Sequence, residues 1–255
     1  MLILISPAKT LDFISELTYK EYTIPGHLHK SEQLVRQLKN LTPQELSDLM
    51  HISSKLAMLN YERYKEWDVP FDDKNARQAI FAFKGDVYTG IDIHRFTEKD
   101  LEYTQKHLRI LSGLHGLLRP LDLIRPYRLE MGTKLTGKGY KNLYEFWDSE
   151  ITASVQAALD EQGDDLLINM ASDEYYKGIN KKQLKARIIT PVFKEYKNGT
   201  YKFLSVYGKK ARGMMTRFIL QNRLKTADEL KLFEEEGYYF NDMQSDRDTF
   251  VFTRG

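Results

Sequence analysis

The apolar positions of the chain follow two patterns, short unbroken runs and longer runs that repeat every three to four residues. Residues 2–5 and 165–171 are short apolar runs, which are typical of buried strands. Residues 31–67 have the repeat of amphipathic helices, and the pattern predicts helix starts at Thr42 and Ser53. The chain is therefore expected to begin with a strand that is followed by a block of helices.

The rest of the chain continues this mixture of strands and helices. The Asn198-Gly199 pair lies between alternating apolar residues and predicts a β-hairpin over residues 187–207. The other predicted elements are a strand at 78–88, a helix starting at Thr97 and running through 101–111, an amphipathic helix at 142–162, a helix at 208–224, a capping box of Thr226 with Glu229, and a hairpin at 238–252 around Ser245. Without repeats or linkers, these elements indicate one α+β domain over residues 1–255, with a β-sheet and surrounding helices.

The segment 111–135 has an unusual density of glycine, proline and basic residues. Gly113 and Gly116 follow the helix-like run, so they are expected to end that helix and to present their amides to a ligand. Two prolines stiffen the following stretch, which carries the cations Arg119, Arg125, Arg128 and Lys134. This combination suits a phosphate group. The alternative is an ordinary helix-turn-helix corner with solvated arginines.

Four segments resemble one known family. The central LSGLHGLLRPLD and PYRLEMGT runs, the opening SPAKT, the NMASDEYYK tract and the YGKKARG stretch resemble the YaaA family of bacterial peroxide-stress proteins, with His115 where an aromatic residue is expected. The resemblance implies an unusual mixed fold, a basic cleft, a helix-hairpin-helix motif, DNA binding, and protection against hydrogen peroxide with less free iron and less oxidative damage. The helix-hairpin-helix match is imperfect, because one extra residue separates Gly113 from Gly116.

The charge of the chain is strongly segregated. It carries 38 basic and 36 acidic residues, for a net charge of +2. Residues 181–225 hold thirteen Lys or Arg against the single acid Glu195, and residues 106–142 hold eight basic residues against two acids. The rest of the chain is consequently acidic. If both basic segments fold onto one surface, that surface is suited to a polyanion.

The predicted helix 208–224 places its cations on one side. At 100° per residue, an apolar stripe lies opposite a basic side that holds Gly213 and the cations Lys209, Lys210, Arg212 and Arg217. A glycine inside a helix costs roughly 1 kcal/mol, and close approach of another backbone is a reason to keep it. The alternative is a solvated basic face with an incidental glycine.

Polar residues also follow the predicted strands. Lys9 comes just after the first strand, a position that often reaches a ligand in sheet-containing folds, although a solvated lysine is the alternative. Asp173 and Glu174 follow the strand at 165–171, where carboxylates commonly cap a helix. If the loops meet at one end of a sheet, Lys9 lies near a candidate polar site of Ser112, His115, Asn169, Ser172, Glu174 and Tyr175. Such a cluster favours a nucleic-acid-processing enzyme as the alternative function.

Several classes of protein and of site are excluded or disfavoured. The chain has no cysteine, which excludes disulfides and thiolate chemistry. Its apolar start is too short for a signal peptide, no run of 18 apolar residues occurs, and we predict a cytoplasmic protein without membrane contact. No metalloprotease, nucleophile-elbow or phosphate-loop motif is present. We predict neither a metal nor a cofactor, because iron storage would need a carboxylate-histidine pattern that is missing.

The leading hypothesis is a peroxide-stress protein that binds double-stranded DNA through its phosphate backbone, and an enzyme is the less favoured alternative. Clear stacking positions for single strands are lacking, since Tyr127 and Tyr207 are the only candidates and both are compatible with a core position. The sequence does not set the oligomeric state, and a monomer is compatible with it.

Overall fold

A mixed β-sheet forms the centre of the molecule. The computed structural model describes residues 1–17 and 19–255. Within these residues an eight-stranded sheet has the order β11-β12-β9-β8-β1-β5-β6, with β10 paired to β9. The strands are β1 (Leu2–Ile5), β5 (Leu108–Ser112), β6 (Gly116–Leu118), β8 (Leu166–Asn169), β9 (Arg187–Lys197), β10 (Thr200–Lys202), β11 (Tyr239–Phe240) and β12 (Thr249–Arg254). The predicted fold class, a sheet with surrounding helices, is confirmed.

The middle of this sheet is parallel. Strand β1 lies between β5 and β8 and runs parallel to both, with Ile3 opposite Leu108 on one side and Ile168 on the other. Strand β9 is parallel to β8 and β12, whereas β6, β10 and β11 each run antiparallel to a neighbour. Both β1 and β8 are buried along their whole length, as their unbroken apolar runs predict. The carboxyl ends of β1, β5 and β8 therefore meet at one edge.

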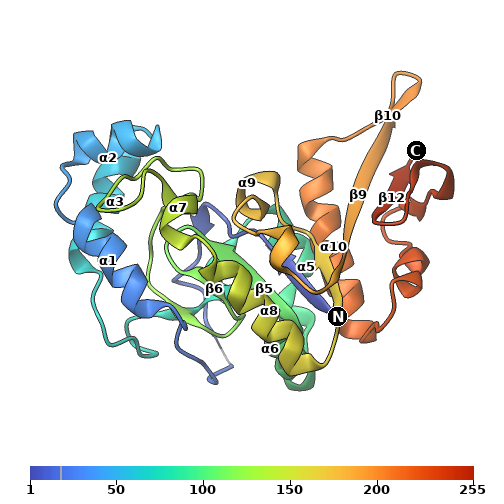
Figure 1. The fold of residues 1–255 in the computed structure, drawn as a ribbon, viewed down its shortest axis with the longest axis horizontal. Helices are drawn as coiled ribbons and strands as arrows, with labels where there is room; N and C mark the ends of the chain where they lie inside the picture. The colour runs from blue at the N-terminus through green and yellow to red at the C-terminus, as the bar shows by residue number, and fades with distance from the viewer. Residues whose placement is uncertain (18) are drawn as a thin grey trace.

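Helices pack around this sheet, and a block of three helices forms one end of the molecule. The block predicted at 31–67 forms α1 (Leu28–Leu38), α2 (Pro43–Met50) and α3 (Ser54–Glu66), which lie at the end of the molecule opposite β9–β12 (Figure 1). The other helices are α4 (Ala79–Ala82), α5 (Asp86–Ile91), α6 (Glu98–His107), α7 (Leu143–Trp147), α8 (Glu150–Gln162), α9 (Asp173–Tyr176), α10 (Ser205–Asn222), η1 (Ile93–Arg95), η2 (Lys181–Gln183), η3 (Asp228–Leu232) and η4 (Asp242–Gln244). Among the described residues, no helix combines the length and apolar character needed to cross a membrane.

Two small sheets tie the loops to this core. Strand β2 (Thr10–Leu11) pairs with β4 (Phe83–Lys84), and β3 (Arg77–Gln78) pairs with β7 (Leu123–Ile124). Both pairs are antiparallel and join segments that are far apart in the sequence. The first pair holds the segment after β1 against the loop before α5.

Local sequence signals are confirmed where side chains bond to nearby backbone. Thr42 and Glu45 form a reciprocal capping box at α2, and Ser53 caps α3. Asn198 and Gly199 both adopt positive φ in the turn between β9 and β10, as an Asn-Gly hairpin requires. The final hairpin is also present, since β11 pairs antiparallel with β12. Caps and turns of this kind depend only on residues within a few positions of one another, so the sequence predicts them without knowledge of the fold.

The helix-hairpin-helix element is not found in the segment where the sequence predicts it. Helix α6 ends at His107, and residues 108–112 form strand β5 instead of continuing the helix. Gly113 lies in the tight turn between β5 and the antiparallel β6, where Ser112 pairs with Gly116. The apolar run fits either element, and its pairing with β1 decides the outcome.

Three other boundaries differ from the predictions. The helix expected at 142–162 is two helices, because Asp148 between α7 and α8 has φ 41° and ψ −124°. The strand expected at 78–88 contains α4 and the start of α5, with only short bridging strands. Helix α10 begins at Ser205, before the expected start at Gly208. In each case the apolar pattern locates buried residues correctly but not the element that carries them.

The two central glycines serve packing and not ligand contact. Both are buried, and the carbonyl of Gly113 accepts a hydrogen bond from Nε1 of Trp147 at 2.9 Å. Gly116 has φ 68°, and a Cβ built there lies 2.8 Å from the Trp147 ring. Both glycines are therefore packed into the core at Trp147 instead of being presented to a phosphate.

Gly213 brings α10 against α5. A Cβ built on Gly213 lies 2.0 Å from the carbonyl oxygen of Val87 and 2.8 Å from Cα of Gly90. A Cβ on Gly90 in turn lies 2.2 Å from the carbonyl oxygen of Lys210. The predicted close approach is present, but the partner is a second helix of the same chain.

We expect Gly213→Ala to destabilise the protein by about 1–3 kcal/mol, because the added methyl overlaps rigid backbone on α5. Urea unfolding monitored by circular dichroism measures this free energy. Gly26→Ala is the matched control, since a Cβ at Gly26 meets nothing within 4 Å. Equal effects of the two substitutions would contradict a tight contact between the helices.

Candidate functional site

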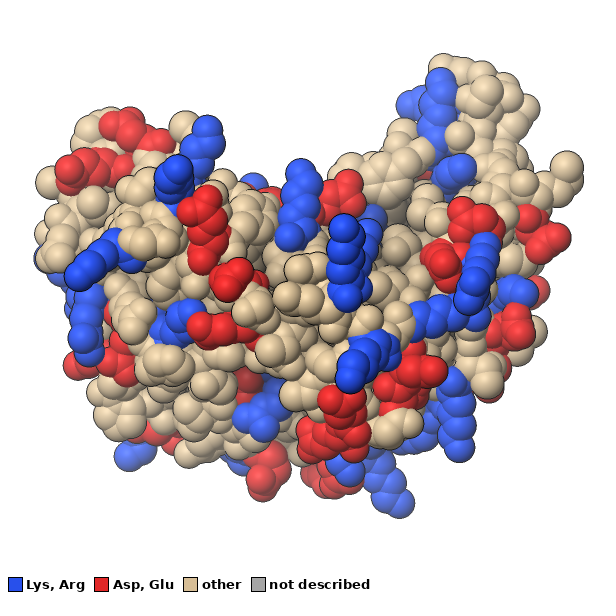
Figure 2. Space-filling model, in the orientation of Figure 1, with Lys and Arg blue, Asp and Glu red and all other residues tan. Residues whose placement is uncertain are grey.

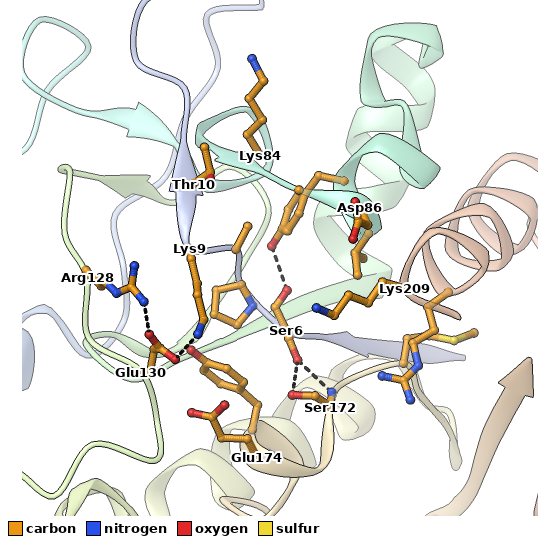
Figure 3. Close-up of a pocket in the computed structure, with 18 of the residues that line it drawn as sticks. Ser6, Lys9, Thr10, Lys84, Asp86, Arg128, Glu130, Ser172, Glu174 and Lys209 are labelled. Carbon is orange, nitrogen blue, oxygen red and sulfur yellow. Dashed lines mark hydrogen bonds and ion pairs between the residues drawn. The ribbon is translucent and has the colours of Figure 1, made fainter. Parts of the chain in front are cut away.

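A pocket lies at the carboxyl ends of β1 and β8. Its volume is about 440 Å³, and segments far apart in the sequence line it (Figure 3). They are residues 6–10 after β1, 84–88 at the start of α5, 127–130 of the central segment, 170–175 after β8, and Lys209 and Arg212 of α10. Ligands of open α/β sheets bind at this edge, outside the carboxyl ends of the strands. The pocket is therefore the candidate functional site.

Two serines join the strand ends at the floor of the pocket. The Ser6 Oγ accepts a hydrogen bond from the Ser172 backbone N–H at 2.9 Å and lies 3.2 Å from the Ser172 Oγ (Figure 3). Ser172 has the backbone conformation of an N-cap of α9, yet its side chain caps no amide of that helix. Its hydroxyl is therefore held at the pocket.

An ion-pair network forms one wall. The Lys9 Nζ lies 2.7 Å from one carboxylate oxygen of Glu130, and the Arg128 Nη2 lies 2.7 Å from the other (Figure 3). The Lys9 side chain is 64% exposed, so its ammonium remains accessible to a ligand. Exposed pairs of this kind contribute little to stability, typically about 0–1 kcal/mol, and exchange partners readily.

The first turns of α10 supply a second pair of cations. Lys209 and Arg212 are three residues apart and line the same pocket. Within residues 1–17 and 19–255, neither side chain forms an ion pair, and the Arg212 Nε is buried without a hydrogen-bond partner. Burial lowers the pKa of Arg212, partly opposed by Asp173, but a guanidinium stays charged at neutral pH.

Tyrosines make up much of the remaining wall. Tyr88, Tyr127 and Tyr175 line the pocket and are each less than 10% exposed. Burial raises the pKa of all three phenols, so they are neutral at physiological pH. The Tyr88 hydroxyl donates to the carbonyl of Ser6 at 3.1 Å, and Tyr127 is bonded to Ser112 at 2.7 Å. The Tyr88 and Tyr127 rings are thus fixed at their hydroxyl ends.

The structure brings seven predicted site residues together at this pocket. They are Lys9, Arg128, Ser172, Glu174, Tyr175, Lys209 and Arg212. The Glu174 carboxylate accepts a hydrogen bond from the Gly132 N–H at 2.9 Å. It therefore bonds to the central segment instead of capping helix α9. Ser112 and Asn169 end strands at the same edge but are buried and do not line the pocket.

The other predicted cations lie elsewhere. Arg119 pairs with the buried Asp122 at 3.0 Å, and Arg217 bonds the carbonyl of Gly90 and pairs with Glu235. Lys210 pairs with Glu236 at 2.6 Å. Arg125 donates to the carbonyl of Glu66 and lines a different pocket, and Lys134 is exposed and does not line the candidate site. The basic segments thus converge only in part, and several of their arginines serve the fold.

Several polar pocket residues were not predicted from the sequence, among them Ser6, Lys84, Asp86 and Glu130. Ser6 was missed, although it follows the same strand as Lys9 and is found by the same argument. Glu130 lies in the segment 111–135, in which only glycines, basic residues, Ser112 and His115 were predicted site residues. Lys84 and Asp86 were read as part of a strand, and the pairing of β4 with β2 brings them to the pocket. A non-local pairing of this kind leaves no local signal.

The pocket lies within a wider hollow. Figure 2 shows a concave surface between the end that holds α2 and α3 and the arm of β9 and β10, with Lys and Arg atoms on its floor and acidic atoms beside them. Helix α9 and the beginning of α10 lie between these two walls (Figure 1). The arm carries the exposed aromatic residues Tyr196 and Phe203, and Tyr207 at the start of α10 is 50% exposed.

Comparison with known proteins identifies the family. The sequence profile of the family described as peroxide stress protein YaaA matches residues 1–244. The chain belongs to the YaaA family. It is 51% identical over 254 residues to UPF0246 proteins of Aliivibrio fischeri strains ES114 and MJ11, covering 100% of this chain and 98% of each relative.

Most of the stretches that carry the resemblance to the YaaA family share one location, whereas LSGLHGLLRPLD contributes no residue to it. The SPAKT, PYRLEMGT, NMASDEYYK and YGKKARG stretches each contribute residues to the pocket. They come from four distant parts of the chain, and the fold brings them together. This convergence supports the pocket as the candidate functional site.

His115 belongs to the core and not to the site. It is fully buried, with its Nδ1 2.9 Å from the Ser31 Oγ, and burial lowers its pKa from 6.5 to about 3. The imidazole is therefore neutral in the folded protein, whereas it binds a proton below pH 6.5 in the unfolded chain. The stabilisation is fully present above pH 6.5 and is lost as the pH falls from 6.5 towards 3.

We expect His115→Gln to reduce the loss of stability between pH 7 and pH 5 by about 2 kcal/mol relative to the parent protein. Urea unfolding at both pH values gives the difference, which does not depend on the overall destabilisation of the variant. An unchanged slope in the His115 variant would show that another group sets the acid sensitivity.

Proposed function

We propose that this protein protects against peroxide stress by binding double-stranded DNA on the positively charged surface around the pocket. Membership of the peroxide stress protein family supports the biological role. The observation that carries DNA binding is the meeting of Lys9, Arg128, Lys209 and Arg212 at one edge of the sheet. Phosphates are the ligands that such a group of cations binds best.

The local charge favours an anion although the protein is nearly neutral. The pocket has five cations, which are Lys9, Lys84, Arg128, Lys209 and Arg212, against the acids Asp86, Glu130 and Glu174. Glu130 pairs with Lys9 and Arg128, and Glu174 accepts a hydrogen bond from the Gly132 N–H. Lys209 and Arg212 form no ion pair among the described residues, so both are available to a ligand. The concave surface supports contact with a rod-shaped partner (Figure 2).

The proposal does not include a helix-hairpin-helix motif, since the residues expected to form it make a β-hairpin. Binding is attributed to side-chain cations and is expected to be tolerant of sequence. We place the protein in the bacterial cytoplasm with the DNA. The associated fall in free iron is proposed as an indirect effect, because the described residues contain no group of three His, Asp or Glu placed to hold a metal ion.

Replacing both Lys209 and Arg212 by Gln should weaken binding to a random-sequence duplex by about tenfold at 100 mM salt. It should also reduce the slope of log affinity against log salt by about 2, because two phosphate contacts are lost. Gel-shift titrations between 50 and 200 mM salt measure both quantities, and the melting temperature checks that the fold is kept.

The matched control replaces Lys99 and Lys106 of α6 by Gln, which removes the same charge. The carbonyl of Lys99 is contacted by Arg223 at the opposite end of α10, and Lys106 lies in the last turn of α6, which leads into the amino end of β5. Equal weakening by both double variants would mean that only net charge matters. Binding that is absent or insensitive to salt in the parent protein would refute the proposal.

A second function is favoured by the position of Lys9, Ser172 and Glu174 at one pocket. A nucleic-acid-processing enzyme would use this polar site next to a basic surface. This alternative predicts conversion of nicked or damaged DNA that is lost on Ser172→Ala, while duplex affinity is retained. Gel analysis after long incubation with Mg²⁺ tests it, and unchanged substrate would remove the alternative.

A further inference from the structure

The pocket contains an anion site without an anion partner in the protein. The Arg212 Nε is buried without a hydrogen bond, and neither Arg212 nor Lys209 pairs with an acid in the described part of the chain. The Arg212 guanidinium lies over the Phe203 ring, with its Cζ 5.8 Å from the ring centroid, and its N–H groups are suited to donate to a phosphate. The Lys209 ammonium points into the same pocket (Figure 3). Together they are suited to one phosphate group.

Beside this anion site the pocket offers surfaces for a flat aromatic ring. Tyr88, Tyr127 and Tyr175 line it together with the apolar side chains of Pro7 and Met170. Because the Tyr88 and Tyr127 hydroxyls are bonded within the protein, these rings lose little freedom when a ligand stacks on them. The serine hydroxyls of the floor supply groups that can bond to the edge of the ring.

The size of the pocket limits what can enter. A volume of about 440 Å³ is within the range of small-molecule sites, roughly 300–1,000 Å³. A base pair inside a duplex is flanked by its stacked neighbours and cannot reach the bottom of such a pocket. A single nucleotide enters only when it is free or has been turned out of the stack.

We propose that this pocket binds one nucleotide, with its phosphate on Lys209 and Arg212 and its base against the tyrosines. The inference rests on the proposed function and makes it more specific. On duplex DNA, the surrounding basic surface holds the backbone while an extrahelical nucleotide occupies the pocket. A free mononucleotide has the same chemistry and is distinguished by experiment.

The test compares three DNA duplexes of the same sequence. One is fully paired, one has a single bulged adenine, and one has a baseless tetrahydrofuran residue in place of that adenine. The two bulged duplexes distort the backbone equally, so their difference reports the base alone. We expect the bulged adenine to bind at least fivefold tighter than the baseless bulge, since stacking of one base contributes about 1–3 kcal/mol. Equal affinities would overturn an extrahelical base in the pocket.

A substitution that fills the pocket separates base binding from backbone binding. Ala8→Phe places a ring among the lining residues and leaves Lys209 and Arg212 unchanged. We expect it to abolish the preference for the bulged adenine and to change the affinity for the paired duplex less than threefold. Thr10→Phe, at an exposed lining residue, is the second variant if Ala8→Phe does not fold, which its melting temperature will show. A preference that survives filling would place the base elsewhere and overturn the inference.

Calorimetric titration with deoxyadenosine monophosphate tests the free ligand. If the parent protein binds the monophosphate, Ala8→Phe does not, and the parent shows no preference for the bulged adenine, the pocket is a site for a free nucleotide. No binding of the monophosphate and no bulge preference overturn the inference, while salt-dependent duplex binding keeps the proposed function. If the monophosphate binds but no duplex does, the nucleotide site is supported and the proposed DNA binding is refuted.

Discussion

The parallel pairing of β1 with both β5 and β8 is the constraint on which the site depends. Its hydrogen bonds align Leu4 with Asn169 and Ile5 with Ile110, so the loops that follow these strands leave from one edge. The bond from the Ser172 N–H to the Ser6 hydroxyl then joins two of these loops. A shift of this register by one residue would reverse the faces of every side chain on the strand and separate the two loops.

A second contact places the basic helix at that edge. Gly90 and Gly213 allow the backbones of α5 and α10 to touch, which larger side chains would prevent. Because α5 begins at Asp86 in the pocket wall, the first turns of α10 are held there as well. The same contact therefore packs the core and positions Lys209 and Arg212, which explains a glycine in the middle of a long helix.

The electrostatic character of the pocket depends on which acids are already engaged. Arg119 and Arg217 lie in the basic segments, yet their charge is compensated by Asp122 and Glu235. Lys209 and Arg212 have no such partner among the described residues, and both line the pocket. A nearly neutral protein can thus present a local anion site, because affinity follows the unpaired charges at one place and not the total.

The sequence by itself determined the elements whose signals are local. It predicted the buried strand of β1, the capping box at Thr42, the bond from the Thr226 N–H to Glu229, the Asn198 hairpin and the positions of the polar strand ends, because each depends on neighbouring residues. Tertiary structure decided the rest. Residues 108–112 became a strand only by pairing with β1, and the same apolar run fits a helix equally well. Which cations face the pocket was likewise set by acids and backbone from distant segments, and no spacing within the chain encodes those partners.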